Sequence, residues 1–106
     1  MTARISVFIL SLFLLAGCAW VKLTPGGEKV RVLSLSEVST CKRLGQTTAS
    51  VTDKVVGLKR QPHIVAENLE MLARNAAADM QGDTIVPQGA VVDGKRAFDV
   101  YRCVGG

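Results

Sequence analysis

The chain has 106 residues, of which 48% are hydrophobic, and a formal net charge of +4. This length allows one domain and excludes a large enzyme with a deep cleft. The charge falls to +3 once Arg4 is set aside, and because the basic residues are dispersed, no nucleic acid partner is expected.

Residues 1–17 have the pattern of an export signal. Arg4 gives a positively charged start, and residues 5–15 form an apolar run interrupted only by Ser6 and Ser11. This run is too short to cross a bilayer as a helix, which takes about 20 residues. It fits the hydrophobic region of a signal peptide, which has about 7–15 residues. The sequence therefore predicts a signal peptide over residues 1–17 and excludes an integral membrane protein.

The end of this signal matches the bacterial lipobox. In Leu15-Ala16-Gly17-Cys18, small residues precede a cysteine, so we expect cleavage between Gly17 and Cys18 and acylation of Cys18, including palmitate. The small residues let a peptidase approach the backbone, and the Cys18 thiolate is the nucleophile that takes the lipid. An ordinary secretory signal followed by a chance cysteine, and an uncleaved core helix, are the alternatives. Ala19, in place of an aspartate, is similar to the outer-membrane pattern, so we expect anchoring there, facing the periplasm.

A short linker and two strands are expected next. Residues 18–28 contain the turn-forming sequence Thr24-Pro25-Gly26-Gly27 and are expected to form a lipidated tether, followed by a domain over residues 29–106. Residues 29–35 partly alternate between apolar and polar side chains, which predicts a strand. Residues 44–51 are a weaker strand candidate, in which Gly45 indicates a bulge or a close approach of another backbone.

Residues 62–81 give the clearest helix. Pro62 suits the first helical position, and Gly82 is expected to end the helix. The residues expected on the packed face recur at helical spacing: Val65, Leu69, Leu72, Ala76 and Met80. Further alanines raise helix propensity and permit close packing on a sheet. Glu70 and Arg74 have the i,i+4 spacing of a favourable ion pair.

The chain is expected to close with a hairpin. Residues 84–86 open a third strand, which Pro87 limits to a sheet edge or a break. Residues 90–92 lead into Asp93-Gly94, a strong hairpin signal, and residues 96–104 form the return strand. The order predicts an α+β fold, with one amphipathic helix on a small, mostly antiparallel sheet of about four strands and one disulfide.

Two cysteines remain once Cys18 is assigned to lipid. Cys41 and Cys103 are expected to form a disulfide, because the domain is predicted to be exported. Redox activity is disfavoured because no Cys-x-x-Cys motif lowers a thiol pKa. A zinc site needs four ligands, which two cysteines and the single His63 do not supply. We therefore expect no metal and no cofactor.

No constellation of catalytic residues is evident. The sequence has no Gly-x-Ser-x-Gly elbow, no phosphate-binding glycine loop and no His-Glu-x-x-His motif. His63 is beside a proline at a helix start, where a solvated role is expected. Turn or solvated positions are also expected for four aspartates: Asp79, Asp83, Asp93 and Asp99. No catalytic residue is assigned, and the protein is not expected to be an enzyme.

Five basic residues form a candidate binding surface: Lys42, Arg43, Lys54, Lys59 and Arg60. Three of them lie in the connection over residues 52–61. Each basic residue near an anionic membrane surface contributes about 1 kcal/mol, so the group fits a binder of lipopolysaccharide or peptidoglycan. A solvated face without a ligand is the alternative.

Several segments together resemble a known family. They are the lipobox, Val30-Arg31-Val32, Cys41-Lys42-Arg43-Leu44-Gly45, Leu72-Ala73-Arg74-Asn75-Ala76-Ala77-Ala78, Gly82-Asp83-Thr84-Ile85-Val86 and Val100-Tyr101-Arg102-Cys103. They resemble small bacterial lipoproteins that carry a domain of unknown function and, more distantly, the lipoprotein sensor of the Rcs envelope-stress phosphorelay. The resemblance implies a helix-on-sheet domain, a Cys41–Cys103 disulfide and an envelope location, but no activity. The long proline-rich tether of the Rcs sensor has no counterpart in this sequence.

From these features we expect a lipid-anchored, non-enzymatic protein of the bacterial envelope that binds an envelope protein partner or contributes to envelope maintenance. Binding of an envelope polymer through the basic residues and sensing of envelope stress are the alternatives.

Overall fold

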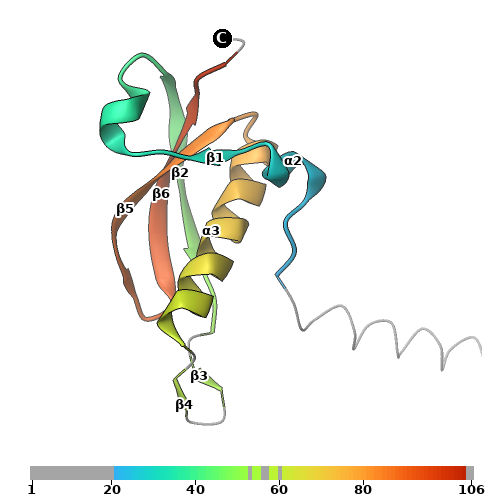
Figure 1. Cartoon of the computed structure of the whole chain (residues 1–106), viewed down its shortest axis with the longest axis vertical. Helices are drawn as coiled ribbons and strands as arrows, with labels where there is room; N and C mark the ends of the chain where they lie inside the picture. The colour runs from blue at the N-terminus through green and yellow to red at the C-terminus, as the bar shows by residue number, and fades with distance from the viewer. Residues whose placement is uncertain (1–20, 53, 56–57, 60, 105–106) are drawn as a thin grey trace, which may run out of the picture.

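A computed structural model of the chain describes residues 21–52, 54–55, 58–59 and 61–104 (Figure 1). The elements in chain order are α2 (Pro25–Glu28), β1 (Arg31–Val32), the 3-10 helix η1 (Leu35–Val38), β2 (Lys42–Ser50), β3 (Lys54–Val55), β4 (Leu58–Lys59), α3 (Pro62–Asp79), β5 (Thr84–Val92) and β6 (Lys95–Arg102). The predicted signal peptide over residues 1–17, its cleavage site at Gly17 and the lipidation site at Cys18 lie outside the described residues, as does Arg60.

Four strands form one mixed sheet in the order β1-β5-β6-β2. β1 pairs with β5 in parallel, whereas β5 with β6 and β6 with β2 are antiparallel. Helix α3 lies across one face of this sheet (Figure 1). The predicted fold class, α+β with one helix on a mostly antiparallel sheet, is therefore confirmed.

Helix α3 packs on the sheet through a stripe of small and branched side chains. The buried residues are Val65, Leu69, Ala73 and Ala77, spaced four apart. The predicted face is correct at Val65 and Leu69 but drifts afterwards, since Leu72 and Met80 are only partly buried at the edge of the core. Ala73 and Ala77 face the sheet because a small side chain lets the helix backbone approach it closely.

The C-terminus of α3 ends in a Schellman motif with an unexpected residue. Gln81 has a φ of +64°, and its N–H donates to the carbonyl of Ala78, while the N–H of Gly82 donates to the carbonyl of Ala77. The prediction that Gly82 ends the helix is therefore wrong, because Gln81 is the residue that adopts the positive φ of the helix stop. Gly82 has a different role, because a Cβ there would lie 2.5 Å from Cγ1 of Val100.

The predicted turn and the bulge indicated in the sheet are confirmed. Asp93 and Gly94 both have positive φ, 51° and 71°, as the type I′ turn between β5 and β6 requires. In β2 the pairing with β6 shifts between Arg43 and Gly45, which is the bulge that Gly45 indicates.

Two apolar clusters lie on opposite faces of the sheet. The larger one joins α3 to Ile85, Phe98 and Val100. The smaller one, Val38, Val86 and Tyr101 with Leu33, Cys41 and Cys103 at its border, lies under η1. Within it, Cys41 and Cys103 form the predicted disulfide, with Cα atoms 4.4 Å apart and a sequence separation of 62.

The segment over residues 21–30, called here the N-terminal segment, packs against α3. The Asn75 side chain donates to the carbonyl of Lys22 at 2.7 Å and accepts from the N–H of Thr24 at 2.8 Å. Thr24 in turn caps α2, where Gly27 is buried, and Val30 enters the main core. The tether was expected over residues 18–28, and the structure describes it from residue 21. Most of this described part is attached to the domain by specific contacts.

Two expected elements differ in extent. The strand expected over residues 29–35 is reduced to β1, which is followed by η1. The connection expected over residues 52–61 contains a small hairpin, in which Lys54 pairs with Lys59 and Val55 with Leu58. This hairpin lies beyond the end of the main sheet (Figure 1).

Candidate binding face and edge groove

The sheet face opposite α3 is covered by η1 at one end only. Beyond that end, side chains of β2 and β6 form a surface, called here the open face: Gln46, Thr48, Ser50, Ala97 and Asp99. The cross-strand pairs Gln46 with Asp99 and Thr48 with Ala97 place these residues on one side of the sheet. Gln46, Thr48 and Ser50 are exposed on this part of the sheet, and Ala97 and Asp99 are partly buried.

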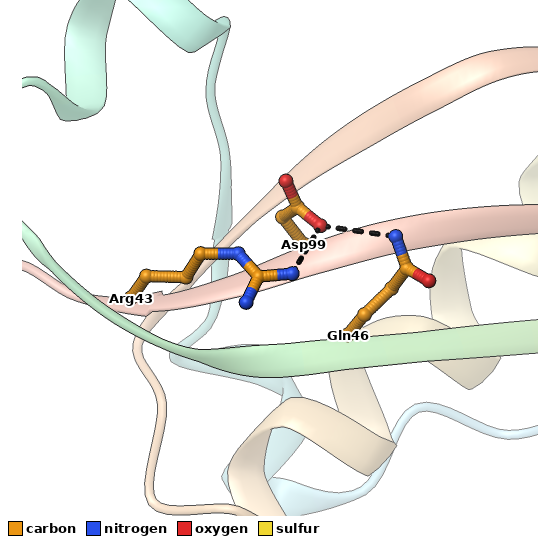
Figure 2. Close-up of polar contacts among 3 residues, drawn as sticks. All are labelled: Arg43, Gln46 and Asp99. Atoms are coloured by element: carbon orange, nitrogen blue, oxygen red, sulfur yellow. Dashed lines mark hydrogen bonds and ion pairs between the residues drawn. The ribbon is translucent and has the colours of Figure 1, made fainter.

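Asp99 is the centre of a polar cluster on the open face. Arg43 Nη2 and Gln46 Nε2 each donate to Oδ1 of Asp99 at 3.2 Å, as Figure 2 shows. The Asp99 side chain is 14% exposed and that of Arg43 is 53% exposed. Within the described residues no donor reaches Oδ2 of Asp99, so this oxygen retains its capacity to accept a hydrogen bond from a bound molecule.

A groove runs along the free edge of β5. Its volume is about 460 Å³, and its lining includes Val32, Leu33, Leu35, Val86, Pro87 and Arg96. We call it the edge groove. Leu35 is 64% exposed and Val32 is 36% exposed, which makes one wall apolar and accessible to solvent.

Pro87 is the physical reason for the edge groove. The N–H of Leu33 donates to the carbonyl of Ile85 at 3.0 Å, and the next bond of this parallel ladder would run from an N–H at position 87 to Leu33. Proline has no N–H, so the ladder ends. The chain then turns away into η1, and the space that a longer β1 would fill stays open.

Arg96 contributes a charged side chain to the lining of the edge groove. Its Nε donates to the carbonyl of Gly89 at 2.9 Å, and its guanidinium carbon lies 5.8 Å from the centroid of the Phe98 ring. In the ranges that the structure describes, no carboxylate forms an ion pair with Arg96. Glu37 follows Ser34 of the groove lining by three residues and is already engaged by it. Hydrogen bonds from the Ser34 N–H and hydroxyl lower the pKa of Glu37.

The predicted basic surface does not form one patch. Lys42 and Arg43 begin β2 next to the disulfide, whereas β3 and β4, which carry Lys54 and Lys59, follow the other end of that strand. The nine residues of β2 extend over about 26 Å, so the two groups lie at opposite ends of the sheet. Arg43 is also paired with Asp99.

The remaining candidates from the sequence are His63 and the aspartates. His63 is exposed at the start of α3, and no group of three His, Cys, Asp or Glu side chains suited to a metal ion occurs in the described part of the chain. Asp99 was expected to be a solvated aspartate, but it is the centre of the open face. Its partner Arg43 is 56 residues away in sequence, so no local pattern reveals the pair.

Asp83 holds the end of β6 in place. Its Oδ1 accepts from the N–H of Cys103 and its Oδ2 from the N–H of Val104, both at 2.8 Å. Partial burial alone would raise the pKa of Asp83, but these two bonds and one from the Thr84 hydroxyl outweigh it, and the pKa is lowered. The carboxylate therefore acts as a structural clamp beside the disulfide.

Comparison with known families identifies the family of this chain. Residues 21–103, from the N-terminal segment through β6 to the second disulfide cysteine, match the domain of unknown function DUF4156. The chain belongs to the DUF4156 family. No curated protein and no solved structure matches the chain. The part assigned to DUF4156 begins before residue 29, in agreement with the contacts that join the N-terminal segment to α3. None of the helices in the described ranges is both long and apolar enough to cross a bilayer.

Proposed function

We propose that this protein is a lipid-anchored, non-enzymatic module of the bacterial cell envelope that binds a protein partner through the open face. The observation that carries the proposal is the state of Asp99, whose carboxylate is oriented by Arg43 and Gln46 yet keeps one oxygen without a donor in the described residues. A polar group held in this way is ready to bind a partner at little entropic cost.

The location rests on two independent features. The lipobox at residues 15–18 supports acylation of Cys18, and the Cys41–Cys103 disulfide supports a domain that folds in an oxidising compartment. Ala19 after the cysteine supports the outer membrane as the destination. The distant resemblance to the Rcs sensor makes envelope-stress sensing the more specific form of this proposal.

Binding of an envelope polymer through basic residues has less support. A chain of phosphates or carboxylates binds best to several cations on one surface. Here Lys42 and Arg43 are separated by the length of β2 from Lys54 and Lys59, and Arg43 is neutralised in part by Asp99. The open face carries a smaller net charge than the five basic residues and has more neutral hydrogen-bonding groups. It therefore suits a protein partner better than a charged polymer.

The lipid anchor can be tested by labelling cells of the native host with radioactive palmitate. The wild-type protein should take up the label and sediment with the outer membrane, and Cys18→Ala should lose both properties. An unlabelled wild-type protein would refute the anchor.

Partner binding can be tested by introducing a photo-crosslinking amino acid at Thr48 or Ser50, both exposed on the open face. The matched control position is Glu67, which is exposed on α3. Irradiation of intact cells should give the same discrete protein adduct from positions 48 and 50 and none from position 67. Absence of an adduct at both open-face positions would contradict the proposed function.

A further inference from the structure

The edge of β5 beyond Ile85 has the properties of an incomplete sheet. β1 covers this edge only at Thr84 and Ile85, and the ladder ends because Pro87 has no N–H. The carbonyl of Leu33, which the ladder would otherwise use next, receives no backbone hydrogen bond within the described ranges. Exposed sheet edges are sites where an extended peptide adds as a further strand.

The lining of the edge groove fits a peptide in the position of a strand. Val32, Pro87 and Arg96 belong to the face of the sheet that α3 covers, because they are in register with Ile85, Phe98 and Ala49 of the main core. Val86 belongs to the opposite face, since it is paired with Asp99. A groove lined from both faces receives the alternating side chains of an extended segment, whereas a pocket on one face does not.

The charge of the edge groove indicates the chemistry of the segment. Arg96 is held in place by Gly89 and Phe98 and lacks a carboxylate partner in the described residues, while Val32 and Leu35 expose apolar surface. Glu37 is engaged by Ser34. A carboxylate flanked by apolar side chains therefore complements the groove.

We propose that the edge groove binds a short extended segment of an envelope protein, in which an acidic residue lies between apolar residues. The segment adds beside β5 as a strand, and its carboxylate pairs with Arg96. Pro87 and the irregular pairing after Gln88 limit the segment to about four residues and oppose pairing between two copies of this chain. This inference rests on the proposed function, whose partner it describes.

The experiment uses the full-length protein in detergent and fluorescent peptides of defined sequence. The probe is acetyl-Thr-Val-Glu-Val-Thr-amide, and the matched peptide has lysine in place of glutamate. Fluorescence anisotropy should show binding of the glutamate peptide and about tenfold weaker binding of the lysine peptide, as expected for one charge contact. A glutamate peptide methylated on its backbone nitrogens should lose binding, because strand addition needs its N–H groups.

Variants test the role of the groove residues. Arg96→Glu should reverse the preference between the two peptides, and Lys95→Glu, the same charge change at an exposed neighbour outside the groove, should not. Because Arg96 contacts Phe98, Leu35→Asp serves as a second variant; it changes an exposed side chain and should weaken binding of the glutamate peptide about tenfold. Equal binding of both peptides, an unchanged preference in Arg96→Glu, or a homodimer crosslinked through position 35 would overturn the inference.

Crosslinking in cells separates this inference from the proposed function. A photo-crosslinking residue at position 35 should give the same partner adduct as position 48. An adduct from position 48 without one from position 35 would reject the groove and leave the proposed function standing. Absence of an adduct from all positions would reject the proposed function itself.

Discussion

Nε of Arg74 donates a hydrogen bond of 2.9 Å to the carbonyl oxygen of Val30, which is 44 residues away in sequence. The same guanidinium donates to the carbonyl of Glu28 at 3.1 Å. One side chain of α3 thus satisfies two carbonyls at the end of the N-terminal segment and holds this segment on the helix.

Replacement of Arg74 should detach the N-terminal segment. Arg74→Ala removes both hydrogen bonds to backbone carbonyls, and we expect the free energy of unfolding to fall by about 2 kcal/mol. Urea denaturation followed by circular dichroism measures this change. The matched control is Glu70→Ala, because no ion pair joins Glu70 to Arg74 among the described residues. If Glu70→Ala destabilises the protein as much as Arg74→Ala, the i,i+4 pair suggested by the sequence matters more than the carbonyl contacts.

Removal of the disulfide should cost a large part of the stability. Cys41 and Cys103 have a sequence separation of 62. Closing a loop of this length lowers the entropy of the unfolded chain and so stabilises the folded protein by about 4 kcal/mol. The double variant Cys41→Ala, Cys103→Ala should therefore melt well below the wild-type protein in thermal denaturation. A reductant should lower the melting temperature of the wild-type protein and leave that of the double variant unchanged. Equal melting temperatures with and without reductant in the wild-type protein would contradict this prediction.

The Asp83 clamp should make stability depend on pH on the acidic side. Because the pKa of Asp83 is lowered in the folded protein, its contribution is fully present above the unfolded-state pKa, about 3.9, and is lost as the pH falls through the folded-state pKa. Asp83→Asn should be less stable than wild type at pH 7, and the difference should shrink towards pH 2. Urea denaturation at several pH values measures both curves. A difference that stays constant with pH would show that the charge of Asp83 is unimportant.

The end of α3 offers a pair of opposite glycine substitutions. Gln81→Gly should stabilise the protein by about 0.5 kcal/mol, because Gln81 has a φ of +64° and glycine adopts this conformation without strain. Gly82→Ala should destabilise it by about 2 kcal/mol, since the new Cβ would lie 2.5 Å from Val100 Cγ1. Thermal denaturation of the two variants should give melting temperatures on opposite sides of the wild-type value. A stabilising Gly82→Ala would show that Val100 leaves room for a Cβ at position 82, and a destabilising Gln81→Gly would contradict the role of Gln81 as helix stop.

Replacement of Pro87 should extend β1. Pro87→Val supplies the N–H that the parallel ladder lacks, so the amide at position 87 should bond to the carbonyl of Leu33 and exchange slowly with deuterium. The edge groove should then be narrower, and the glutamate peptide should bind more weakly than to the wild-type protein. Rapid exchange at position 87 would show that another feature ends β1.

The sequence predicts the features that depend on neighbouring residues. Asp93-Gly94 forms the expected turn, Gly45 marks the bulge in β2, and Pro62 begins α3. The disulfide was also predictable, because a domain that the sequence predicts to be exported has two remaining cysteines and therefore one possible pairing.

Features that depend on distant residues were not predictable in this way. The extent of β1 is set by Pro87, more than fifty residues later, and the link from Arg43 to Asp99 depends on the register of β2 after its bulge. The drift in the packed face of α3 has another cause. Ala73 and Ala77 carry little hydrophobic signal in a sequence, yet they are the residues that permit close approach to the sheet.

The bonds between Asn75 and the N-terminal segment have a mechanical consequence for an anchored protein. Four peptide steps separate Cys18 from Lys22, a distance of at most about 14 Å when fully extended. An acylated Cys18 would therefore hold the domain close to the membrane surface, with α2 and the end of α3 next to the bilayer. A force that pulls the domain away from the membrane would first load the hydrogen bonds of Asn75 with Lys22 and Thr24.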